Sequence, residues 1–537
     1  MDPLEREAAM IELLMLLLFL PVCYAETHYR FKYFFSYLYK SEPEIIADIP
    51  SRIEPKSVLP VLLIVKDAHL FPVQLNNIEI TDSPDEALLA KIDIGVQIDL
   101  PYWEKIINIP VESLTAGTHF LNICIHYSMG DREKSCLNDN HRGTTHQPLP
   151  VYIADETLPQ IDNCIYGDTH VHSNYSSDQV EFGASLESTI RIARAMGMQF
   201  FCATDHSYDL DDDPEDYLKS DPDLRKWAAF LNEAERLNSE NREFVVIPGE
   251  EVSVRNSAER TVHCLVFNSK QFFPGSGDGA EEWPNTRCEL SLIDLLQRLP
   301  DQALAFAAHP GERPPFLQRL LIRRGIWNHI DYNTNGLTGL QVINCADEIS
   351  DQRGLSDWIT GLLSGQRLIG ICGSDAHGNF ARYRQIDFPF FTMRENYQHL
   401  FGQWRTGVYS NKLTPELEGL LTGLKKGHCF MTNGPALRFG FISNSQWFDC
   451  TSEYNRAAEL KIKTKSSKEF ARLQSVVVYI GNYGQTSEEI LKKWILKPGI
   501  YEFEDTLQFN PPFGHGYLRC EVVTAVNRKA ISNPIWF

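Results

Sequence analysis

Hydrophobic and polar residues alternate differently in three successive parts of the chain. Between residues 26 and 158, short apolar or alternating runs rich in β-branched residues are separated by Pro, Gly, Asp and Asn. These runs occupy residues 58–65, 77–81, 91–100 and 119–128. Alternation with a period of two is typical of half-buried strands, and no helical pattern interrupts the runs, so this part predicts a β-sandwich.

From residue 159 to residue 428, strand-like runs alternate with helical ones. The runs at residues 165–172 and 199–205 enclose residues 186–197, where Ile190, Ala193 and Gly197 fit a helical period. Further strand-like runs occupy residues 244–252, 262–267, 303–310, 337–344 and 367–375, with helical stretches at residues 223–238 and 289–299. Such alternation predicts parallel strands covered by helices, in either a barrel or a doubly wound sheet.

The last part of the chain, residues 429–537, returns to strands. The runs at residues 460–465, 475–482 and 517–527 predict a second β-sandwich-like domain. A chain of 537 residues is too long for one hydrophobic core. We therefore expect three domains, over residues 26–158, 159–428 and 429–537.

An apolar run over residues 11–25 precedes these domains. It predicts a signal peptide over residues 1–25, although Glu12 and the acidic stretch before the run are atypical of such a signal. The alternative is a buried amphipathic helix. The run is shorter than the roughly 20 residues of a membrane-spanning helix. We therefore expect a secreted or periplasmic protein without a stable membrane span.

Charge and cysteine content narrow the function classes. The net charge of −21 makes a nucleic-acid polymer an improbable partner, whereas bound metals would still allow a small anionic substrate. The twelve cysteines are scattered and form neither a disulfide framework nor a CxxC zinc motif. Cys124 and Cys136 flank a predicted hairpin turn and would be able to pair in an oxidising compartment.

Residues that bind metals stand where the predicted strands of the middle part end. His170 and His172 flank Val171, so both imidazoles point to the same face of a strand. The carboxyl ends of the strands of a β/α barrel meet at one mouth, so residues far apart in sequence are expected to converge there. The candidate ligands are His170, His172, Asp178, His206, Glu250 or Glu251, His263, His309, Asp375 and His377.

This set favours two or three divalent ions of zinc, manganese or iron. Imidazole and carboxylate ligands suit these metals, and one zinc ion takes only three or four protein ligands. Each motif alone has a plainer interpretation, such as a helix N-cap for Asp375 or a surface pair for Glu250 and Glu251. Their occurrence at every strand end favours the metal site. Four other histidines lack such neighbours and are interpreted as structural: His329, His399, His428 and His515.

The order HxH, Asp, TDH, PGxE, a strand His, AHP and GSDAH resembles the PHP family, named for polymerase and histidinol phosphatase. The resemblance covers about half the chain. It implies a distorted (βα)7 barrel, up to three metals, and Glu251 as the Glu ligand. It also implies three ligand groups: His170, His172, Glu251 and Asp375; Glu251, His263 and His309; and Asp178, His206 and His377.

Other segments of the chain resemble one particular branch of the PHP family. The opening YGDTHVHSNYSSD, the later GHCFMTNGPAL and the N-terminal β-domain resemble the CehA/McbA-like metallohydrolases, a branch named for enzymes that cleave an aryl carbamate. Gln179 departs from that pattern, because the family often has Gly after the Asp at this position. This departure concerns the loop and leaves Asp178 in place.

These observations predict a metal-dependent hydrolase of small-molecule esters. A hydroxide held between two metals would attack phosphorus or a carbonyl carbon, and a phosphoesterase is the first hypothesis. A carboxylic or carbamic ester or amide hydrolase and a non-catalytic ligand-binding module are the alternatives, and a polymerase-associated exonuclease is disfavoured by the acidic charge. Arg313, Arg382 and Arg384 are the candidate substrate contacts, since Arg binds phosphate or carboxylate through two parallel bonds. The sequence leaves the oligomeric state open.

Overall fold

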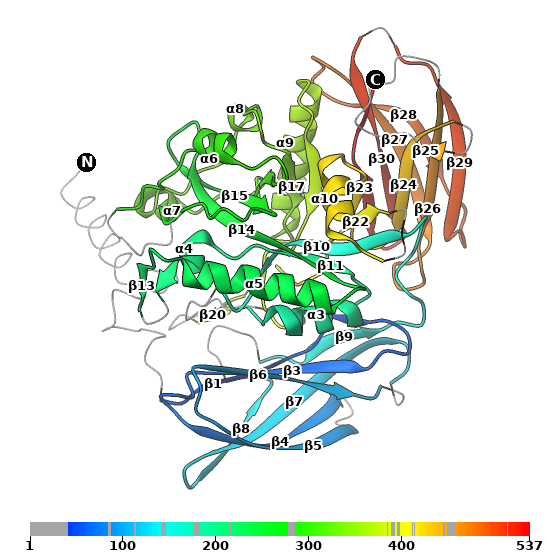
Figure 1. Cartoon of the computed structure of the whole chain (residues 1–537). Coiled ribbons are helices and arrows are strands. Elements are labelled where there is room, and N and C mark those ends of the chain that lie inside the picture. The colour runs from blue at the N-terminus through cyan, green and yellow to red at the C-terminus, as the bar shows by residue number, and fades with distance from the viewer. Residues whose placement is uncertain are drawn as a thin grey trace, which may run out of the picture.

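The computed structural model describes residues 41–83, 87–111, 114–140, 146–176, 183–213, 216–277, 285–383, 385–387, 392–394, 398–410, 412, 414–443, 446–447, 458–512 and 514–537. The predicted signal segment and the candidate residues Asp178 and Arg384 lie outside these ranges. The described residues form a mixed α/β structure with many strands and few helices, which confirms the broad fold class. Figure 1 shows the N-terminal strands packed under the middle part, with the C-terminal sheets beside it.

The N-terminal part consists of two facing sheets. One contains β1 (Glu44–Asp48), β3 (Leu59–Lys66) and β6 (Tyr102–Ile109), all antiparallel. The other contains, in order, β2 (Arg52–Ile53), β9 (Leu149–Ile153), β7 (Gly117–Met129), β4 (Val73–Ser83) and β5 (Ala87–Ile98), with β8 (Arg132–Leu137) on β7. Apolar residues from both sheets share one core, as expected for a sandwich.

Strand β3 connects this sandwich to the middle part, and all its residues are buried. Val61, Leu63 and Val65 point into the sandwich core. Leu62 and Ile64 belong instead to the core of the middle part. Burial of both faces explains why residues 58–65 read as a continuous apolar run without alternation.

The middle part places seven strands side by side, and the last of them lies next to the first. The order is β10 (Cys164–His172), β11 (Phe200–Ala203), β14 (Val245–Arg255), β15 (Thr261–Phe267), β16 (Leu304–Ala307), β17 (Gly339–Ile343) and β18 (Ile369–Cys372). Beyond β18, β19 (Ala376–His377) pairs in parallel with β10. Thr169 Oγ1 also donates to the carbonyl of Cys372 at 2.9 Å. The ends of these strands therefore surround a common centre.

One strand runs against the expected direction. β15 pairs antiparallel with both β14 and β16, whereas the other neighbouring pairs of this series are parallel. The reason is the short connection over residues 256–260, because a parallel crossover needs a dozen or more residues. His263 lies near the start of β15, so the reversal puts it at the edge where the other strands end.

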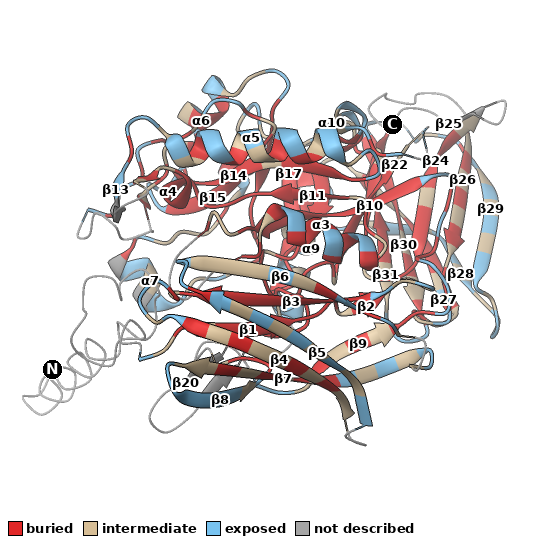
Figure 2. Cartoon of the chain, turned by 60° about the horizontal axis from the view of Figure 1, so that its bottom comes forward, coloured by how far each residue is buried: buried red, intermediate tan, exposed pale blue. Residues whose placement is uncertain are grey.

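The helices connect and cover these strands. They are α3 (Leu186–Ala195), α4 (Ser207–Leu210), α5 (Arg225–Glu240), α6 (Leu292–Arg298), α7 (Phe316–Leu321), α8 (His329–Tyr332), α9 (Glu348–Leu363) and α10 (Leu417–Lys425). Short strand pairs β12 (Asp212–Asp213) with β13 (Asp216–Ser220), and β20 (Gln385–Asp387) with β21 (Thr392–Arg394), lie in the connections. In Figure 2 the strands under α5 are buried, whereas the outer face of α5 is exposed. The predicted helices at residues 186–197, 223–238 and 289–299 correspond to α3, α5 and α6.

The C-terminal part continues the sheet of the middle part. From β10 the hydrogen bonding runs through β22 (Arg405–Tyr409), β23 (Cys429–Thr432), β31 (Lys529–Ser532), β30 (Gly516–Thr524), β27 (Leu473–Asn482) and β28 (Glu489–Ile495), with β32 (Ile535–Trp536) on β30. A second sheet contains β25 (Gln446–Trp447), β24 (Ala436–Ser443), β26 (Ala458–Lys465) and β29 (Glu502–Phe509). The chain therefore becomes all-β near residue 429, without a break in the sheet.

Cys124 and Cys136 are free thiols in the structure. Cys124 stands opposite Leu137 and Cys136 opposite Ile125 on strands β7 and β8, so the two side chains leave opposite faces of the sheet. Burial raises the pKa of Cys136 to about 12. Within the described ranges, none of the helices is long and apolar enough to cross a membrane.

A buried ion pair joins the N-terminal and middle parts. Asp48 on β1 accepts from the backbone of Phe380 and Ala381 at 2.9 and 3.0 Å, and from Nε of Arg382 at 3.2 Å. Arg382 is only 2 % exposed, and its guanidinium also donates to the carbonyl of Gly378. The structure thus gives Arg382 a role in holding two regions together, in place of the substrate contact expected from its sequence position.

Replacing Asp48 with Ala should destabilise the protein strongly, because it leaves the Arg382 charge buried without its carboxylate. We expect the free energy of unfolding to fall by roughly 3–5 kcal/mol, measured by chemical denaturation. The control is Lys91→Ala, which removes an exposed pair with Glu79 and should have a much smaller effect on stability. Equal effects of the two substitutions would contradict this role for Asp48.

Candidate metal centre

Four side chains converge on one buried point: two from the end of β10, Glu251 from within β14, and Asp375 from the connection after β18. Nε2 of His170 lies 3.2 Å from Nε2 of His172, 3.5 Å from Oε2 of Glu251 and 3.2 Å from Oδ1 of Asp375. Nε2 of His172 lies 3.4 Å from the same Glu251 oxygen and 3.1 Å from the same Asp375 oxygen. Ligands placed tetrahedrally about 2.1 Å from a metal ion are about 3.4 Å apart. The group therefore has the dimensions of a metal site.

The hydrogen bonds of the two imidazoles support this interpretation. Nδ1 of His170 lies 2.9 Å from Oε1 of Gln341, an atom that can only accept, so Nδ1 carries the proton. Nδ1 of His172 lies 3.2 Å from Oγ of Ser176, which is able to accept in the same way. When the two imidazoles are neutral, both Nε2 atoms present lone pairs to each other and to two carboxylate oxygens. Such a convergence in a buried place could hold a metal ion.

Glu251 is the centre of the whole arrangement, and its two oxygens face different sets of histidines. Oε1 lies 2.8 Å from Nδ1 of His263 and 2.9 Å from Nε2 of His309. Oε2 faces the His170–His172 pair and also lies 3.0 Å from Nδ1 of His206. Each oxygen of Glu251 thus faces histidine nitrogens that are able to bind a metal, so this carboxylate is suited to bridge two metal ions.

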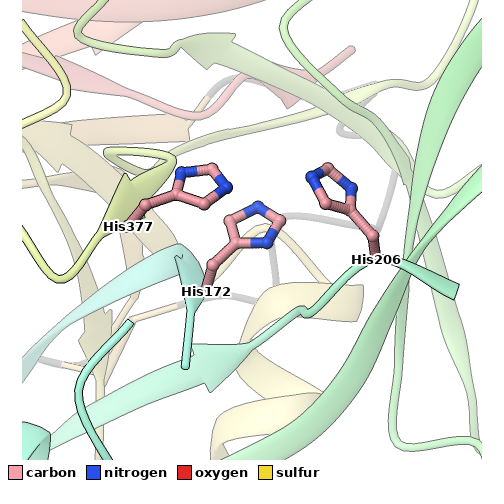
Figure 3. Close-up of side chains that lie close together, drawn as sticks. All are labelled: His172, His206 and His377. Carbon is pink, nitrogen blue, oxygen red and sulfur yellow. The ribbon is translucent and has the colours of Figure 1, made fainter. Parts of the chain in front are cut away.

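A stack of imidazoles extends the site on the side of His172, as Figure 3 shows. The ring of His377 lies parallel to that of His172, with centroids 3.9 Å apart, and the ring of His206 lies 4.4 Å from that of His172. One nitrogen from each of these three histidines falls within 4.8 Å of the others. His206 and His377 are thus together, as expected, while their expected partner Asp178 lies outside the described residues.

The electrostatics of the cluster agree with a positively charged occupant. Burial opposes ionisation of Glu251, yet His263, His170 and His206 hold its pKa well below the usual value. Burial likewise disfavours the charged form of His172, but its bonds to Asp375 and Glu251 raise its pKa to about 10. The carboxylates therefore stay ionised and raise the pKa values of His170 and His172, whereas burial and the nearby charge of His172 lower the pKa of His206.

Buried groups behind the ligands fix their positions. Asp168 accepts from the backbone N–H groups of His170, Ser374 and Gly402 at 3.2, 2.9 and 2.9 Å. Asp205 accepts from the backbone N–H groups of Ser173 and Ser176 at 2.7 and 2.9 Å, which holds the loop after His172. The ligand-bearing segments are thus tied to the core by charge-assisted hydrogen bonds.

Two ligands have a backbone conformation that non-glycine residues rarely adopt. His309 has φ of 31° and Asp375 has φ of 57°. The neighbouring residues Cys345 and His399 have φ of 58° and 52°. Unfavourable backbone geometry of this kind tends to occur at functional sites, where the surrounding structure enforces it.

The structure adds residues that the sequence pattern did not indicate. Nδ1 of His399 lies 3.9 Å from Oδ2 of Asp375, and Asn344 Nδ2 donates to that oxygen at 3.3 Å and to Oε1 of Glu312 at 2.6 Å. Glu312, Asp375 and His399 thus form a further group that could hold an ion. The guanidinium of Arg324 contacts Nε2 of His263. His399, expected to be structural, therefore lies at the site.

The remaining candidates lie elsewhere or face away. Glu250 is buried on the opposite side of its strand, where it accepts from Ser207 Oγ at 3.0 Å and where burial raises its pKa well above the usual value. This agrees with the choice of Glu251 as the ligand. Arg313 donates to the carbonyls of Pro310 and Glu312 and lies 3.6 Å from Asp357.

No family model matches the chain, and no curated protein matches it. Solved structures match it only with low overall similarity. A superoxide reductase (neelaredoxin) from Ignicoccus hospitalis is 10% identical, with 18% of this chain and 74% of that chain covered and a TM-score of 0.14. A β-glucuronidase from glycoside hydrolase family 2 is 9% identical (93% and 50% covered), and a Bacteroides uniformis β-glucuronidase is 10% identical (91% and 60% covered), both with a TM-score of 0.19.

The chain thus spans about half to three-fifths of those two glucuronidases. TM-scores this low carry no argument about its fold or function.

The purified protein should contain two or three divalent metal ions per chain. His170→Ala and Asp375→Ala should each lose at least one of them, because each removes a donor from the buried group. Elemental analysis by mass spectrometry measures this, with His329→Ala as the control, since His329 is exposed on α8. Metal content unchanged in both site variants would rule out this binding site.

Gln341→Leu should weaken metal binding while leaving every ligand in place. Oε1 of Gln341 accepts from Nδ1 of His170 at 2.9 Å and from the backbone of His309 at 3.1 Å. Loss of such an orienting partner typically costs about 10–100-fold in metal affinity. Competition with a chromogenic chelator measures the change, and Gln352→Leu, on the exposed face of α9, should leave the affinity as it is.

Proposed function

We propose that this protein is a metal-dependent hydrolase of the PHP type that acts on esters. The observation that carries the proposal is the convergence of His170, His172, Glu251 and Asp375, the first ligand group that the PHP resemblance implies. The seven strands from β10 to β18, with β19 returning to β10, agree with a distorted (βα)7 barrel. The ligands lie at one edge of these strands, the usual place for a barrel active site.

The donor set fits divalent metals better than any other group. Imidazole nitrogens and carboxylate oxygens are ligands of zinc, manganese and iron, and Glu251 has an oxygen for each of two ions. Metal ions bound there would supply Lewis-acid activation of a water molecule and of the ester. The protein contributes fixed ligand positions, through Asp168, Asp205 and Gln341, and a buried surrounding of low dielectric.

A phosphoric ester is the substrate class we favour. Arg324 contacts His263, so its guanidinium lies at the edge of the ligand cluster. A guanidinium is able to bind two oxygens of a phosphoryl group at once and to stabilise the charge that develops on them. Hydrolysis then forms a bond from water oxygen to phosphorus and breaks the bond to the alcohol, which leaves with a proton.

A carboxylic or carbamic ester is the second candidate, and one observation favours it. Helix α7 lies in the same connection as His309, and it exposes Phe316 and Leu320 by 73% and 60%. Apolar side chains in this connection would suit an acyl or aryl group better than a phosphate. The two substrate classes therefore predict different roles for Arg324.

The experiment compares hydrolysis of p-nitrophenyl phosphate, bis-p-nitrophenyl phosphate, naphthyl acetate and a naphthyl carbamate by the metal-loaded protein. We expect turnover of a phosphate ester that is abolished in His170→Ala and Asp375→Ala. Arg324→Gln should lower kcat/KM for the phosphate ester by about 10²-fold, as removal of a transition-state donor does. The matched control is Arg323→Gln, because the adjacent Arg323 is exposed.

The other outcomes are equally informative. Turnover of the acetate or carbamate alone, with little effect of Arg324→Gln, would select the acyl branch. A folded, metal-loaded protein that hydrolyses none of the four compounds would count against the enzyme and favour a ligand-binding module.

A further inference from the structure

A second unusual electrostatic environment lies away from the metal centre, around Arg405 at the start of β22. Arg405 is only 4 % exposed. Its Nη1 donates to the carbonyl of Gly402 at 3.0 Å, and its guanidinium lies over the ring of Phe470 with its carbon 5.5 Å from the ring centroid. Nε and Nη2 are buried and have no hydrogen-bond partner among the described residues.

Glu469, the carboxylate whose charge acts on Arg405, is already bonded to another arginine. Arg52 donates to Glu54 at 2.7 Å, and to both oxygens of Glu469 at 3.1 and 3.0 Å. Glu54 accepts in addition from the backbone of Leu158 at 3.0 Å. Burial and the nearby charge of Arg52 lower the pKa of Arg405 to about 10, so it remains charged at neutral pH. Within the part of the chain that the structure describes, Arg405 therefore has no carboxylate of its own.

Two other buried arginines each have a carboxylate within ion-pair distance. Arg382 has Asp48 at 3.2 Å, and Arg519 has Glu488 at 2.6 Å. A buried cation without a counter-charge is costly, and water satisfies its hydrogen bonds but not its charge. Arg405 departs from this pattern, because the described residues give it no carboxylate within ion-pair distance, and Glu469, whose charge acts on it, is bonded to Arg52.

We propose that a small monovalent anion of the halide type binds beside Nε and Nη2 of Arg405. Two adjacent N–H donors on one guanidinium edge point the same way and are able to hold one such ion. The position is a junction of three regions, since Arg52 belongs to the N-terminal part, Arg405 to the middle part, and Glu469 and Phe470 to the C-terminal part. The bound anion would stabilise this junction.

The junction is connected to the metal centre through the backbone of Gly402. Its carbonyl accepts from Arg405, and its N–H donates to Asp168 at 2.9 Å. Asp168 in turn accepts from the backbone of His170 and Ser374. An anion that fixes the Arg405 guanidinium therefore also restrains the segments that carry two of the proposed metal ligands.

The test is thermal unfolding of the full chain in sodium bromide or chloride against sodium gluconate at the same ionic strength. We expect a saturable rise in Tm of about 1–3 °C with halide, because the ion binds only the folded state. The rise should disappear in Arg405→Gln. It should persist in the control Arg382→Gln, which removes a buried arginine that has its own carboxylate.

Crystals grown in bromide provide a second measurement that does not depend on a folded variant. An anomalous peak within about 3.5 Å of Nε and Nη2 of Arg405 would establish the site. An ordered water at that position in bromide, with equal Tm in halide and gluconate, would overturn the proposal. Neither result depends on whether the protein is a hydrolase.

Discussion

The buried carboxylate of Glu251 is the constraint on which the rest of the site depends. It lies 1 % exposed among histidines from four other strand ends, and its two oxygens divide them into two groups. An ionised carboxylate in the interior is tolerated only where positive charge surrounds it. The ends of β10, β11, β15 and β16 must therefore approach the same point, and this requirement shapes the sheet around it.

Buried polar side chains that bond to the ligand-bearing segments hold the strand ends close to Glu251. Asp168, Asp205 and Gln341 bond to backbone and side chains on different strands, so each connects two ligand-bearing segments. The left-handed backbone at His309 and Asp375 also brings their side chains toward Glu251. Folding energy gained elsewhere in the core offsets the cost of these arrangements.

Much of this site could be predicted from the sequence, because strand ends are local features. The HxH spacing placed His170 and His172 on one face, whereas the residues alone left Glu250 or Glu251 open, and only the PHP resemblance favoured Glu251. Residues whose position depends on long connections could not be predicted. His399 and Arg324 follow no strand of the series directly, and the short turn before β15 reversed a strand that the alternation pattern had predicted to be parallel. Arg382 followed a ligand motif closely, yet its partner Asp48 is distant in the sequence.

The continuous sheet from β10 through β22 and β23 to β31 affects when one of its strand edges is covered during synthesis. β23 (Cys429–Thr432) pairs with β31 (Lys529–Ser532), which follows it much later in the sequence. While the chain is being synthesised from its N-terminus, β23 therefore has an open edge until residues 529–532 have been made. Exposed edges of this kind promote wrong pairing between molecules. Synthesis of β31, rather than formation of the metal site, is then the step after which this strand edge is covered.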